Sequence, residues 1–378
     1  MRDGGAVLTV PKAVAEYPLP AAWQTHEVAY AGHNVLVVSQ QTDSVLVQVA
    51  IDPATGRPLE AAGHVIATPR SGLHGLHASK ANPGCVWATL QFDDRLLLIQ
   101  PGTSVEMPPT ILHEIAIPAP ARGPHVVIED GDDLWTTCKD SSHVVRVSAS
   151  DPADATVYPC SRRPIFVARH PGSDLVYASL DKTSRILEID PTEGRTSETA
   201  IPAEEGTTPV GLVTGPDGNV WFVLLGSSSG GTGTFAKIAG DGSIVWYRLT
   251  SSTASSAGLI HLAWSESPDG GPVLWLLASS TASMMIPNAV VRVTFQDDYR
   301  TIATQETLSL PTQMSMAHRV LPLGGNLYVT EMMSSVLAHI PVAQAPRPAV
   351  DEASDYYGDF GLGQPADHVV YADPYGPV

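Results

Sequence analysis

Short runs of alternating apolar and polar residues, separated by polar turns, extend along most of the chain. The segment from Pro209 to Phe222 has an apolar run, a Gly-Pro-Asp-Gly turn and a second run that ends in an aromatic pair. Two such runs joined by a turn rich in Gly and Asp are typical of a β-hairpin. The pattern predicts strands rather than helices, and the 32 glycines and 32 prolines among 378 residues agree with this.

The same hairpin pattern occurs seven times. Clear copies begin at Pro124, Pro164, Pro209 and Ala317, and weaker copies begin at Thr25, Leu73 and Ile260. The copies are roughly 40 to 57 residues apart, and several short strands in each period of this length are characteristic of β-propeller blades. We therefore predict an all-β fold, a seven-bladed β-propeller.

Further strands complete the predicted blades. Third strands are expected at 45–51, 144–147, 185–189 and 290–295, and fourth strands at 114–118, 199–202 and 307–311. The segment Glu16–Pro20 resembles a fourth strand but precedes the first copy, so it should complete the last blade and close the ring. A pair of β-sandwiches, the alternative architecture, explains neither the period nor this displaced strand.

The predicted organisation is an N-terminal segment (1–15), one propeller domain (16–342) and a C-terminal tail (343–378). The composition changes after Val342 to a stretch rich in Pro, Asp, Tyr and Gly. Such a composition is typical of a loose tail.

Charge and composition exclude some classes of function. The formal net charge is −18, with 39 acidic against 21 basic residues, and such a surface repels nucleic acid and anionic lipid. The chain has no apolar run of membrane-spanning length, and its start has no apolar signal-peptide core. Three scattered cysteines do not form a disulfide framework or a zinc motif. We expect a cytoplasmic protein that binds a small molecule and neither nucleic acid nor membrane; a homodimer is left open.

The blade motif resembles a known family. The segment Pro209–Phe222, together with the strand motif Glu-Ile-x-Ile-Pro seen at 114–118, is similar to the repeats of virginiamycin B lyase and its relatives, which are seven-bladed propellers. The resemblance extends over residues 16–342 and is close at 199–222, 113–137 and 317–331. In that family, His and Glu bind Mg²⁺ at the mouth of the propeller, and a further His acts as base when an ester is opened by elimination.

The resemblance implies roles for particular residues. It places the family's functional histidines at His261 and His318, and a metal-binding Glu within one residue of Glu331. This chain departs from the family at Met316, where the family has a Glu two residues before its catalytic His. Mg²⁺ prefers carboxylate oxygens and water to imidazoles, so this His-rich mouth suits it poorly.

Histidines recur at one position of the repeat. The second residue of the seven predicted innermost strands is, in order, His26, His74, His125, Ile165, Val210, His261 and His318. Thirteen histidines spread at random over 378 residues would place fewer than one on these seven positions. Because the innermost strands of a propeller surround its axis, these side chains should converge at one mouth of the central channel.

Other side chains are expected at the same mouth. The second strands return to it, and the flanking loops add apolar groups, so the mouth should form a small-molecule pocket. We predict His318, His261 and Glu331 as catalytic residues. The predicted substrate-binding residues are His26, His74, His125, Gln40, Gln91, Lys139, Trp23, Met316 and Arg319. A histidine kept by blade duplication can also be purely structural, above all His26 or His74.

Neutral imidazoles can take and return protons near pH 7. We therefore expect a lyase or cyclase of natural-product biosynthesis that binds a polyketide- or terpenoid-type substrate. It would promote dehydration or elimination and ring closure, including hetero-Diels–Alder closure, without a cofactor. The propeller architecture also resembles that of fungal biosynthetic cyclases, which include hetero-Diels–Alderases.

Three alternatives stay open. The first is a metal-dependent lyase that opens a cyclic ester by elimination, with a divalent metal at His261, His318 and Glu331. The second is an oxygenase with a histidine-bound metal such as iron, as in the seven-bladed carotenoid-cleaving oxygenases. The third is a non-catalytic binding propeller.

Overall fold

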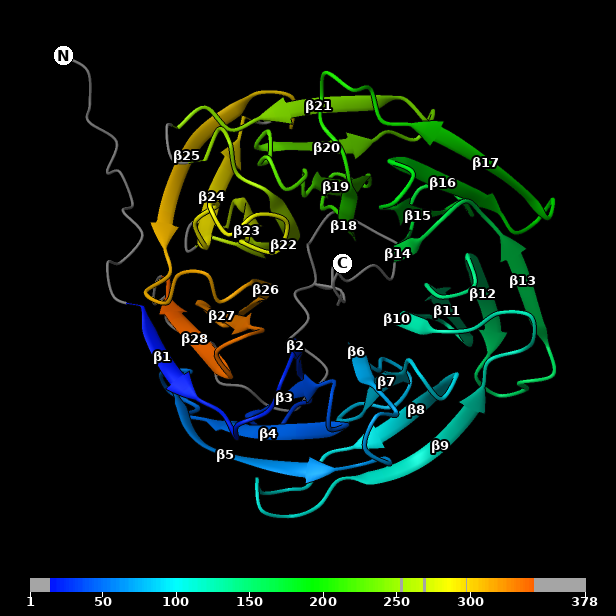
Figure 1. Cartoon of the computed structure of the whole chain (residues 1–378), viewed down its shortest axis with the longest axis vertical. Coiled ribbons are helices and arrows are strands. Elements are labelled where there is room, and N and C mark those ends of the chain that lie inside the picture. The colour runs from blue at the N-terminus through cyan, green and yellow to red at the C-terminus, as the bar shows by residue number, and fades with distance from the viewer. Residues whose placement is uncertain (1–13, 252–253, 268–269, 297, 343–378) are drawn as a thin grey trace.

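Seven four-stranded antiparallel sheets are arranged as blades around a common axis (Figure 1). The structure is a computed structural model, and it describes residues 14–251, 254–267, 270–296 and 298–342. The predicted all-β fold, a seven-bladed propeller, is confirmed. The C-terminal tail expected at 343–378 lies outside the described residues. No helix in the described ranges has the length and apolar character needed to cross a membrane.

In six blades the first strand in the chain is innermost and the next three follow outward in order. The seventh blade takes its outermost strand from the N-terminus. The innermost strands are β2 (Thr25–Tyr30), β6 (Leu73–Ala78), β10 (Pro124–Asp130), β14 (Pro164–Arg169), β18 (Pro209–Thr214), β22 (Leu259–Glu266) and β26 (Ala317–Leu323). The second strands are β3 (Val35–Gln40), β7 (Val86–Leu90), β11 (Asp133–Cys138), β15 (Val176–Leu180), β19 (Val220–Leu224), β23 (Pro272–Ala278) and β27 (Asn326–Glu331).

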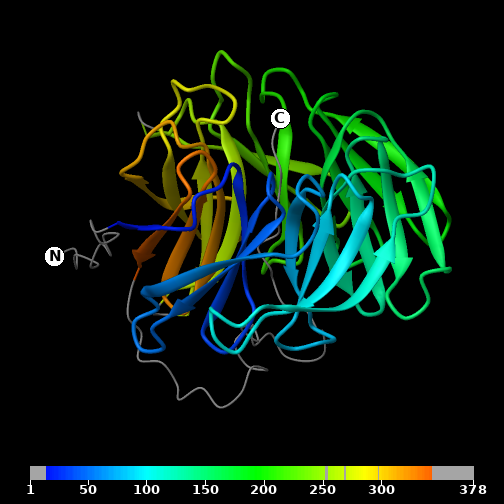
Figure 2. The same ribbon diagram turned by 60° about the horizontal axis from the view of Figure 1, so that its bottom comes forward.

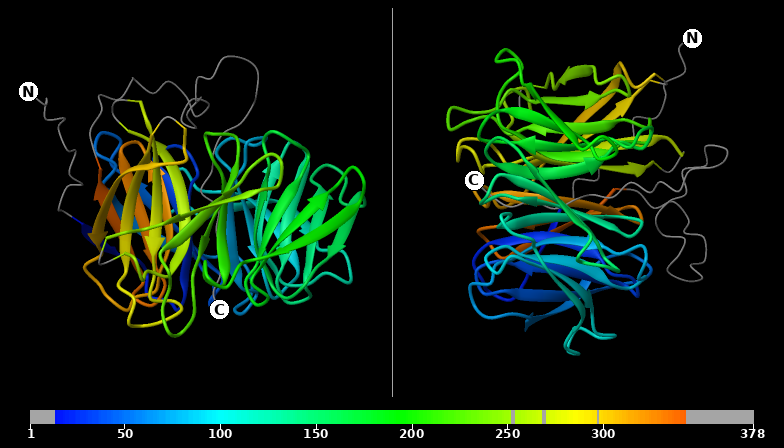
Figure 3. Two further views of the ribbon diagram at one scale, coloured as in Figure 1. Left: turned by 90° about the horizontal axis from the view of Figure 1, so that it is seen from above. Right: turned by 90° about the vertical axis from the view of Figure 1, so that its right-hand side faces the viewer.

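The outer half of each blade is built in the same order. The third strands are β4 (Val45–Ile51), β8 (Arg95–Gln100), β12 (His143–Ser148), β16 (Arg185–Asp190), β20 (Thr234–Ile238), β24 (Ala289–Phe295) and β28 (Val336–Pro341). The outermost strands are β5 (Pro58–Val65), β9 (Thr110–Ala116), β13 (Ala155–Pro159), β17 (Arg195–Ala200), β21 (Ile244–Arg248), β25 (Ile302–Ser309) and β1 (Ala15–Pro18). In the side views the strands run from one face of the ring towards the other (Figures 2 and 3).

The N-terminal strand closes the ring as predicted. β1 pairs antiparallel with β28, with Glu16 opposite Ala338, and the blue and orange strands lie side by side in Figure 1. The Glu16 carboxylate also accepts hydrogen bonds from the backbone N–H and the hydroxyl of Thr312, both at 2.8 Å. This strand therefore joins the last blade to the loop that leaves the sixth blade.

The outermost strands end earlier than the sequence pattern predicts. The predicted strand 114–118 corresponds to β9, which ends at Ala116. Ile117 leaves the sheet because its N–H donates to the carbonyl of Asp94 at 2.8 Å, and its side chain is buried. Leu19 and Ile201 make the equivalent bonds to Ser335 and Ser184. The apolar residue of the motif thus anchors the loop to the next blade instead of extending the strand.

Every innermost strand has a β-bulge near its start. In β2, Thr25 pairs with Gln40 and Val28 with Val38, so His26 and Glu27 both stand opposite Ser39. The register shifts at the corresponding place in the other six blades. A bulge re-aims side chains, so two consecutive residues need not point to opposite faces as they do in a regular strand.

Hydroxyl groups opposite these bulges bind the next blade. Each is a Ser or Thr of a second strand, and each donates to the backbone carbonyl of a bulge residue. The bonds are Ser39 Oγ to His74 O (2.7 Å), Thr89 Oγ1 to His125 O (3.2 Å), Thr137 Oγ1 to Ile165 O (2.8 Å) and Thr330 Oγ1 to His26 O (2.5 Å). Four consecutive blade junctions are therefore held by the same buried bond.

Gly75 shows how closely the blades approach at these junctions. A Cβ at this position would lie 2.6 Å from the carbonyl oxygen of His125. The Gly75 N–H instead donates to Thr89 Oγ1 at 2.8 Å, and that hydroxyl donates onward to His125. Glycine is needed here because any side chain would push the two blades apart.

We expect Thr89→Val to lower the free energy of unfolding by about 1–3 kcal/mol, because it leaves a buried N–H and a buried carbonyl without this partner. Chemical denaturation monitored by tryptophan fluorescence would measure the change. The control is Thr196→Val on the exposed face of β17, which should stay within about 0.5 kcal/mol of the unmodified protein. Equal losses in both variants would contradict a role for the hydroxyl.

Candidate functional site

The first bulge residue of each innermost strand contributes to a ring around the axis, here called the bulge ring. Its members are His26, His74, His125, Ile165, Val210, Ile260 and His318, as the strand registers define them. The prediction placed His261 in this ring, and that alignment is wrong by one residue. In β22, Leu259 pairs with Ala278 and His261 with Leu277, so Ile260 is the extra residue of the bulge.

Four imidazoles from adjacent blades form one half of the bulge ring. We call His318, His26, His74 and His125 the imidazole cluster. Its ring centroids are 4.8 Å apart for His318 and His26, 4.5 Å for His26 and His74, and 4.2 Å for His74 and His125. All four side chains are completely buried. The structure therefore brings together four of the five histidines predicted to converge.

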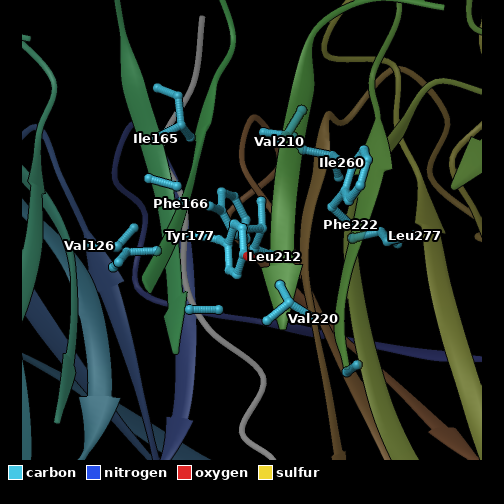
Figure 4. Packing of buried hydrophobic residues seen from close by; sticks show 14 of the residues in the cluster. Val126, Ile165, Phe166, Tyr177, Val210, Leu212, Val220, Phe222, Ile260 and Leu277 are labelled. Atoms are coloured by element: carbon cyan, nitrogen blue, oxygen red, sulfur yellow. The ribbon is translucent and has the colours of Figure 1, made fainter. Parts of the chain in front are cut away.

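The other half of the bulge ring is aliphatic. Ile165, Val210 and Ile260 belong to one buried apolar cluster and lie at about the same level in Figure 4. Phe166 and Leu212 continue this cluster along the innermost strands. The axis thus has a polar side on blades seven, one, two and three, and an apolar side on blades four, five and six.

Two of the imidazoles have a defined tautomer. Nδ1 of His74 lies 2.9 Å from the carbonyl oxygen of His125, and Nδ1 of His318 lies 3.3 Å from that of His26. A carbonyl can only accept, so Nδ1 carries the proton and Nε2 carries the lone pair. The Nε2 atoms of His74 and His318 have no hydrogen-bond partner among the described residues, and the same is true of both ring nitrogens of His125. Buried polar atoms of this kind are costly and are typical of a binding site.

Burial keeps these imidazoles neutral at physiological pH. It lowers the pKa of His74 and of His125 well below the usual value, and lowers the pKa of His318 to about 3. Nearby positive charge, including that of Lys139, acts in the same direction. His74, His125 and His318 are therefore weak bases but good uncharged hydrogen-bonding groups.

A charged network lies next to the imidazole cluster. It is formed by residues that come directly after bulge-ring members in the sequence. Arg319 Nη1 lies 2.6 Å from His261 Nε2, which must accept because a guanidinium only donates. Glu27 lies 3.6 Å from both His318 Nδ1 and Arg319 Nε. These four side chains are completely buried. The network holds His318 in place from the side opposite its lone pair.

Glu27 was missed by the sequence analysis. Regular alternation along β2 would send it away from His26, and only the bulge lets both contribute to the axis. The signal that could have found it is weak, since the same position in other blades is occupied by Gly75, Val126 or Phe166.

The residues that the resemblance implied as metal ligands do not come together. His261 binds Arg319, whereas Glu331 accepts a hydrogen bond from Ser334 at 3.2 Å and interacts with Glu16. Within the described ranges, no group of three or more His, Cys, Asp or Glu side chains is placed to hold a metal ion. His261, His318 and Glu331 therefore do not fit a divalent metal.

Glu331 is a perturbed carboxyl at the edge of the site. Burial and, to a smaller extent, the neighbouring Glu16 raise its pKa to about 7, while Ser315 and Ser334 oppose the shift. Because Glu16 belongs to β1, this carboxyl pair lies beside the pairing of β1 with β28 that closes the ring.

The predicted glutamines hold loops at the face where the innermost strands begin, here called the entrance face. Gln40 Nε2 donates to the carbonyl of Pro20 at 2.7 Å, and Gln91 Oε1 accepts from Gln41 Nε2 at 2.9 Å. Trp23 is 64% exposed. These residues lie at the entrance face, and the two glutamines hold its loops together.

A methionine-rich rim borders the entrance face at blades six and seven. Six of the eight methionines lie in loops there: Met284, Met285, Met314, Met316, Met332 and Met333. Backbone bonds join Met332 to Met316 and to Thr25, so the rim continues into the first blade. Methionine is flexible and polarisable, which suits a surface that adapts to an apolar ligand.

The stability of the protein should fall as pH drops from about 6.5 towards 3. A histidine whose pKa is lowered in the folded state is protonated preferentially in the unfolded state at these pH values. For His318 alone the loss is on the order of a few kcal/mol over this window. His318→Asn should flatten the curve of unfolding free energy against pH, and His113→Asn, on an exposed outer strand, serves as the control. Parallel curves for all three proteins would contradict this.

We expect Glu331→Gln to stabilise the protein at pH 8 and to be nearly neutral at pH 5. A carboxyl whose pKa is raised by folding costs stability as pH rises from about 4.5 through about 7, because the folded state must then lose its proton. Melting temperatures of both proteins from pH 5 to pH 8 would measure the difference. A stabilisation that is independent of pH would argue against the shifted carboxyl.

No protein-family model matches the sequence, and no curated protein matches it. The fold is similar to solved structures. Virginiamycin B lyase from Staphylococcus aureus matches with a TM-score of 0.66 and 16% identity, over 88% of this chain and 99% of the other. A catalytically inactive variant of that lyase with quinupristin gives a TM-score of 0.67 and 15% identity, over 88% and 99%. A chain of a mitotic checkpoint complex gives 0.65 and 10%, over 90% and 94%. The chain thus has the seven-bladed propeller fold of virginiamycin B lyase.

Proposed function

We propose that this protein is a small-molecule enzyme of the lyase or cyclase type that acts at the imidazole cluster. The observation that carries the proposal is the set of buried, neutral imidazoles from adjacent blades, in which Nε2 of His74 and His318 and both ring nitrogens of His125 have no partner among the described residues. A structural role alone would satisfy those atoms.

The surroundings of the cluster favour a large, mostly apolar substrate. The methionine rim and exposed Trp23 offer an adaptable apolar surface at the entrance face, and Ile165, Val210 and Ile260 offer another beside the imidazoles. A polyketide- or terpenoid-type compound has both parts that such a site needs, an apolar body and a few hydroxyl or carbonyl groups.

The neutral imidazoles favour hydrogen-bond catalysis over strong-base catalysis. His318, with a pKa of about 3, removes a proton poorly unless the proton is already acidic, as it is next to a carbonyl. Dehydration of a β-hydroxy carbonyl compound or closure of an oxygen-containing ring fits this limit. In ring closure, orientation of the two partners and polarisation of a carbonyl supply the rate, and no covalent step is required.

Opening of a cyclic ester is the second candidate function. It is favoured by the fold shared with virginiamycin B lyase and by His318 at the start of the last innermost strand. Met316 and the separation of Glu331 from the cluster count against the same mechanism. A non-catalytic binding propeller is the third candidate, since a mitotic checkpoint chain has the fold at a similar TM-score.

The proposal predicts a mass signature for each reaction. The protein would be incubated with a panel of β-hydroxy ketones, diene-bearing polyketides and quinupristin. The products would be separated by chromatography and their masses measured by mass spectrometry. Dehydration removes the mass of one water, whereas ring closure and ester elimination change the retention time without changing the mass. Hydrolysis adds one water and would contradict all of these reactions.

Variants at His318 separate catalysis from folding. His318→Asn keeps a donor near the His26 carbonyl but removes Nε2, so turnover should fall at least about a hundredfold, as for the loss of a general acid or base. His113→Asn, on an exposed outer strand, is the matched control and should keep full turnover. Unchanged turnover in His318→Asn, with unchanged melting temperature, would remove the cluster from the mechanism.

A further inference from the structure

The backbone sets the hydrogen-bonding direction of two rings in the imidazole cluster. Nδ1–H of His74 donates to the carbonyl oxygen of His125 at 2.9 Å. Nδ1–H of His318 donates to the carbonyl oxygen of His26 at 3.3 Å, and the Glu27 carboxylate, 3.6 Å from the same nitrogen, also favours a proton there. Both rings therefore present a lone pair at Nε2, and a lone pair can only accept a hydrogen bond.

His125 differs from these two rings, because neither of its ring nitrogens has a partner among the described residues. Burial lowers its pKa well below the usual value, so the ring is neutral, with one donor nitrogen and one acceptor nitrogen. Nε2 of His74 and Nε2 of His318 also have no partner among the described residues. Together the three rings offer three acceptors and one donor.

The rings do not satisfy one another. His74 and His125 lie nearly face to face, with centroids 4.2 Å apart and 32° between the ring planes. An imidazole N–H lies in the plane of its ring, so it cannot point at a neighbour stacked against that plane. His26 lies between His74 and His318, with its centroid 4.5 Å from the first and 4.8 Å from the second. A bound molecule is therefore the natural partner for these buried nitrogens.

We propose that the imidazole cluster binds compounds with two or more hydroxyl groups, which donate to Nε2 of His74, to Nε2 of His318 and to the acceptor nitrogen of His125. The oxygen of a ketone, ether or ester only accepts, so among these three rings it can bind only the N–H of His125. A hydroxyl group both donates and accepts, so it suits His125 as well. The aliphatic half of the bulge ring contacts the hydrocarbon part of the ligand.

The choice of the imidazole cluster as the ligand site rests on the proposed function, and the hydroxyl preference narrows its substrate class. A polyketide- or terpenoid-type compound would be held through hydroxyl groups, with a carbonyl only at His125. A ligand that brings no donor would leave buried acceptors without a partner, and this weakens binding because those nitrogens are already removed from water.

The test is a titration of the whole protein with resorcinol, its monomethyl ether and its dimethyl ether, which carry two, one and no hydroxyl donors on the same ring. We expect resorcinol to bind at least about tenfold more tightly than the dimethyl ether, with the monomethyl ether between them. The hydrophobic effect alone gives the opposite order, because each methyl group adds apolar area. An equal or reversed order, or no binding of resorcinol, would overturn the proposal.

Nitrogen NMR of the protein with isotope-labelled histidine tests the tautomers directly. His74 and His318 should each show a protonated Nδ1 and an unprotonated Nε2, and the signals missing from His74→Asn and His318→Asn would identify them. Resorcinol should shift both Nε2 signals, and the dimethyl ether should leave them in place. A proton on Nε2 of either ring in the free protein would overturn the proposal.

His74→Asn removes Nε2 and keeps a donor near the carbonyl of His125. The preference for resorcinol over its dimethyl ether should fall at least about threefold in this variant, since one acceptor is lost. The control is His113→Asn, on an exposed outer strand, which should keep the full preference. An unchanged preference in folded His74→Asn would overturn the proposal, and if the variant does not fold, the affinity order in the unmodified protein decides.

Failure of the hydroxyl site and failure of the proposed function give different results. The expected affinity order without turnover of any compound in the panel would defeat the enzyme proposal and leave the hydroxyl site intact. Turnover of a compound that has carbonyl groups but no hydroxyl, lost in His318→Asn, would defeat the hydroxyl preference and leave the enzyme proposal intact.

Discussion

The bulge at the start of each innermost strand is the constraint on which both the ring and the site depend. It turns a backbone carbonyl towards the preceding blade, where a Ser or Thr hydroxyl binds it at four junctions. At His125 and His26 the same carbonyl also accepts from the imidazole of the preceding blade. One backbone feature thus joins the blades and sets which imidazole nitrogen carries the proton.

The division of the bulge ring into polar and apolar halves follows from the same junctions. The four blades that carry imidazoles are the ones whose second strands donate such a hydroxyl to the next blade. The stability supplied by these bonds offsets the buried nitrogens of His74, His125 and His318 that have no partner among the described residues. The fifth and sixth blades have Val223 and Leu277 opposite or beside the bulge, and there Ile165, Val210 and Ile260 pack as an ordinary core. Within the bulge ring, the nitrogens without a partner among the described residues therefore lie on one side, as expected when stability is given up where a ligand binds.

Much of this structure could be predicted from the sequence because hairpins and their period leave a direct trace in it. Seven blades, the closing strand at Glu16 and four converging histidines all follow from repeated apolar runs and turns. The shift from His261 to Ile260 and the position of Glu27 do not follow, because a bulge is defined by cross-strand pairing and not by the strand's own residues. A period of two along the strand assigns faces correctly only where no residue is inserted.

Neutrality connects the parts of the site. Burial deprives His74, His125 and His318 of their charge near pH 7 and weakens the charge of Lys139, while Arg319 and Glu27 balance each other beside the cluster. A charged ligand would lose its hydration on entering the site, and these neutral groups would recover little of that free energy. An uncharged ligand loses little on entry and gains hydrogen bonds that are strong in a medium of low polarity. The same desolvation that weakens the imidazoles as bases therefore selects neutral, largely apolar compounds.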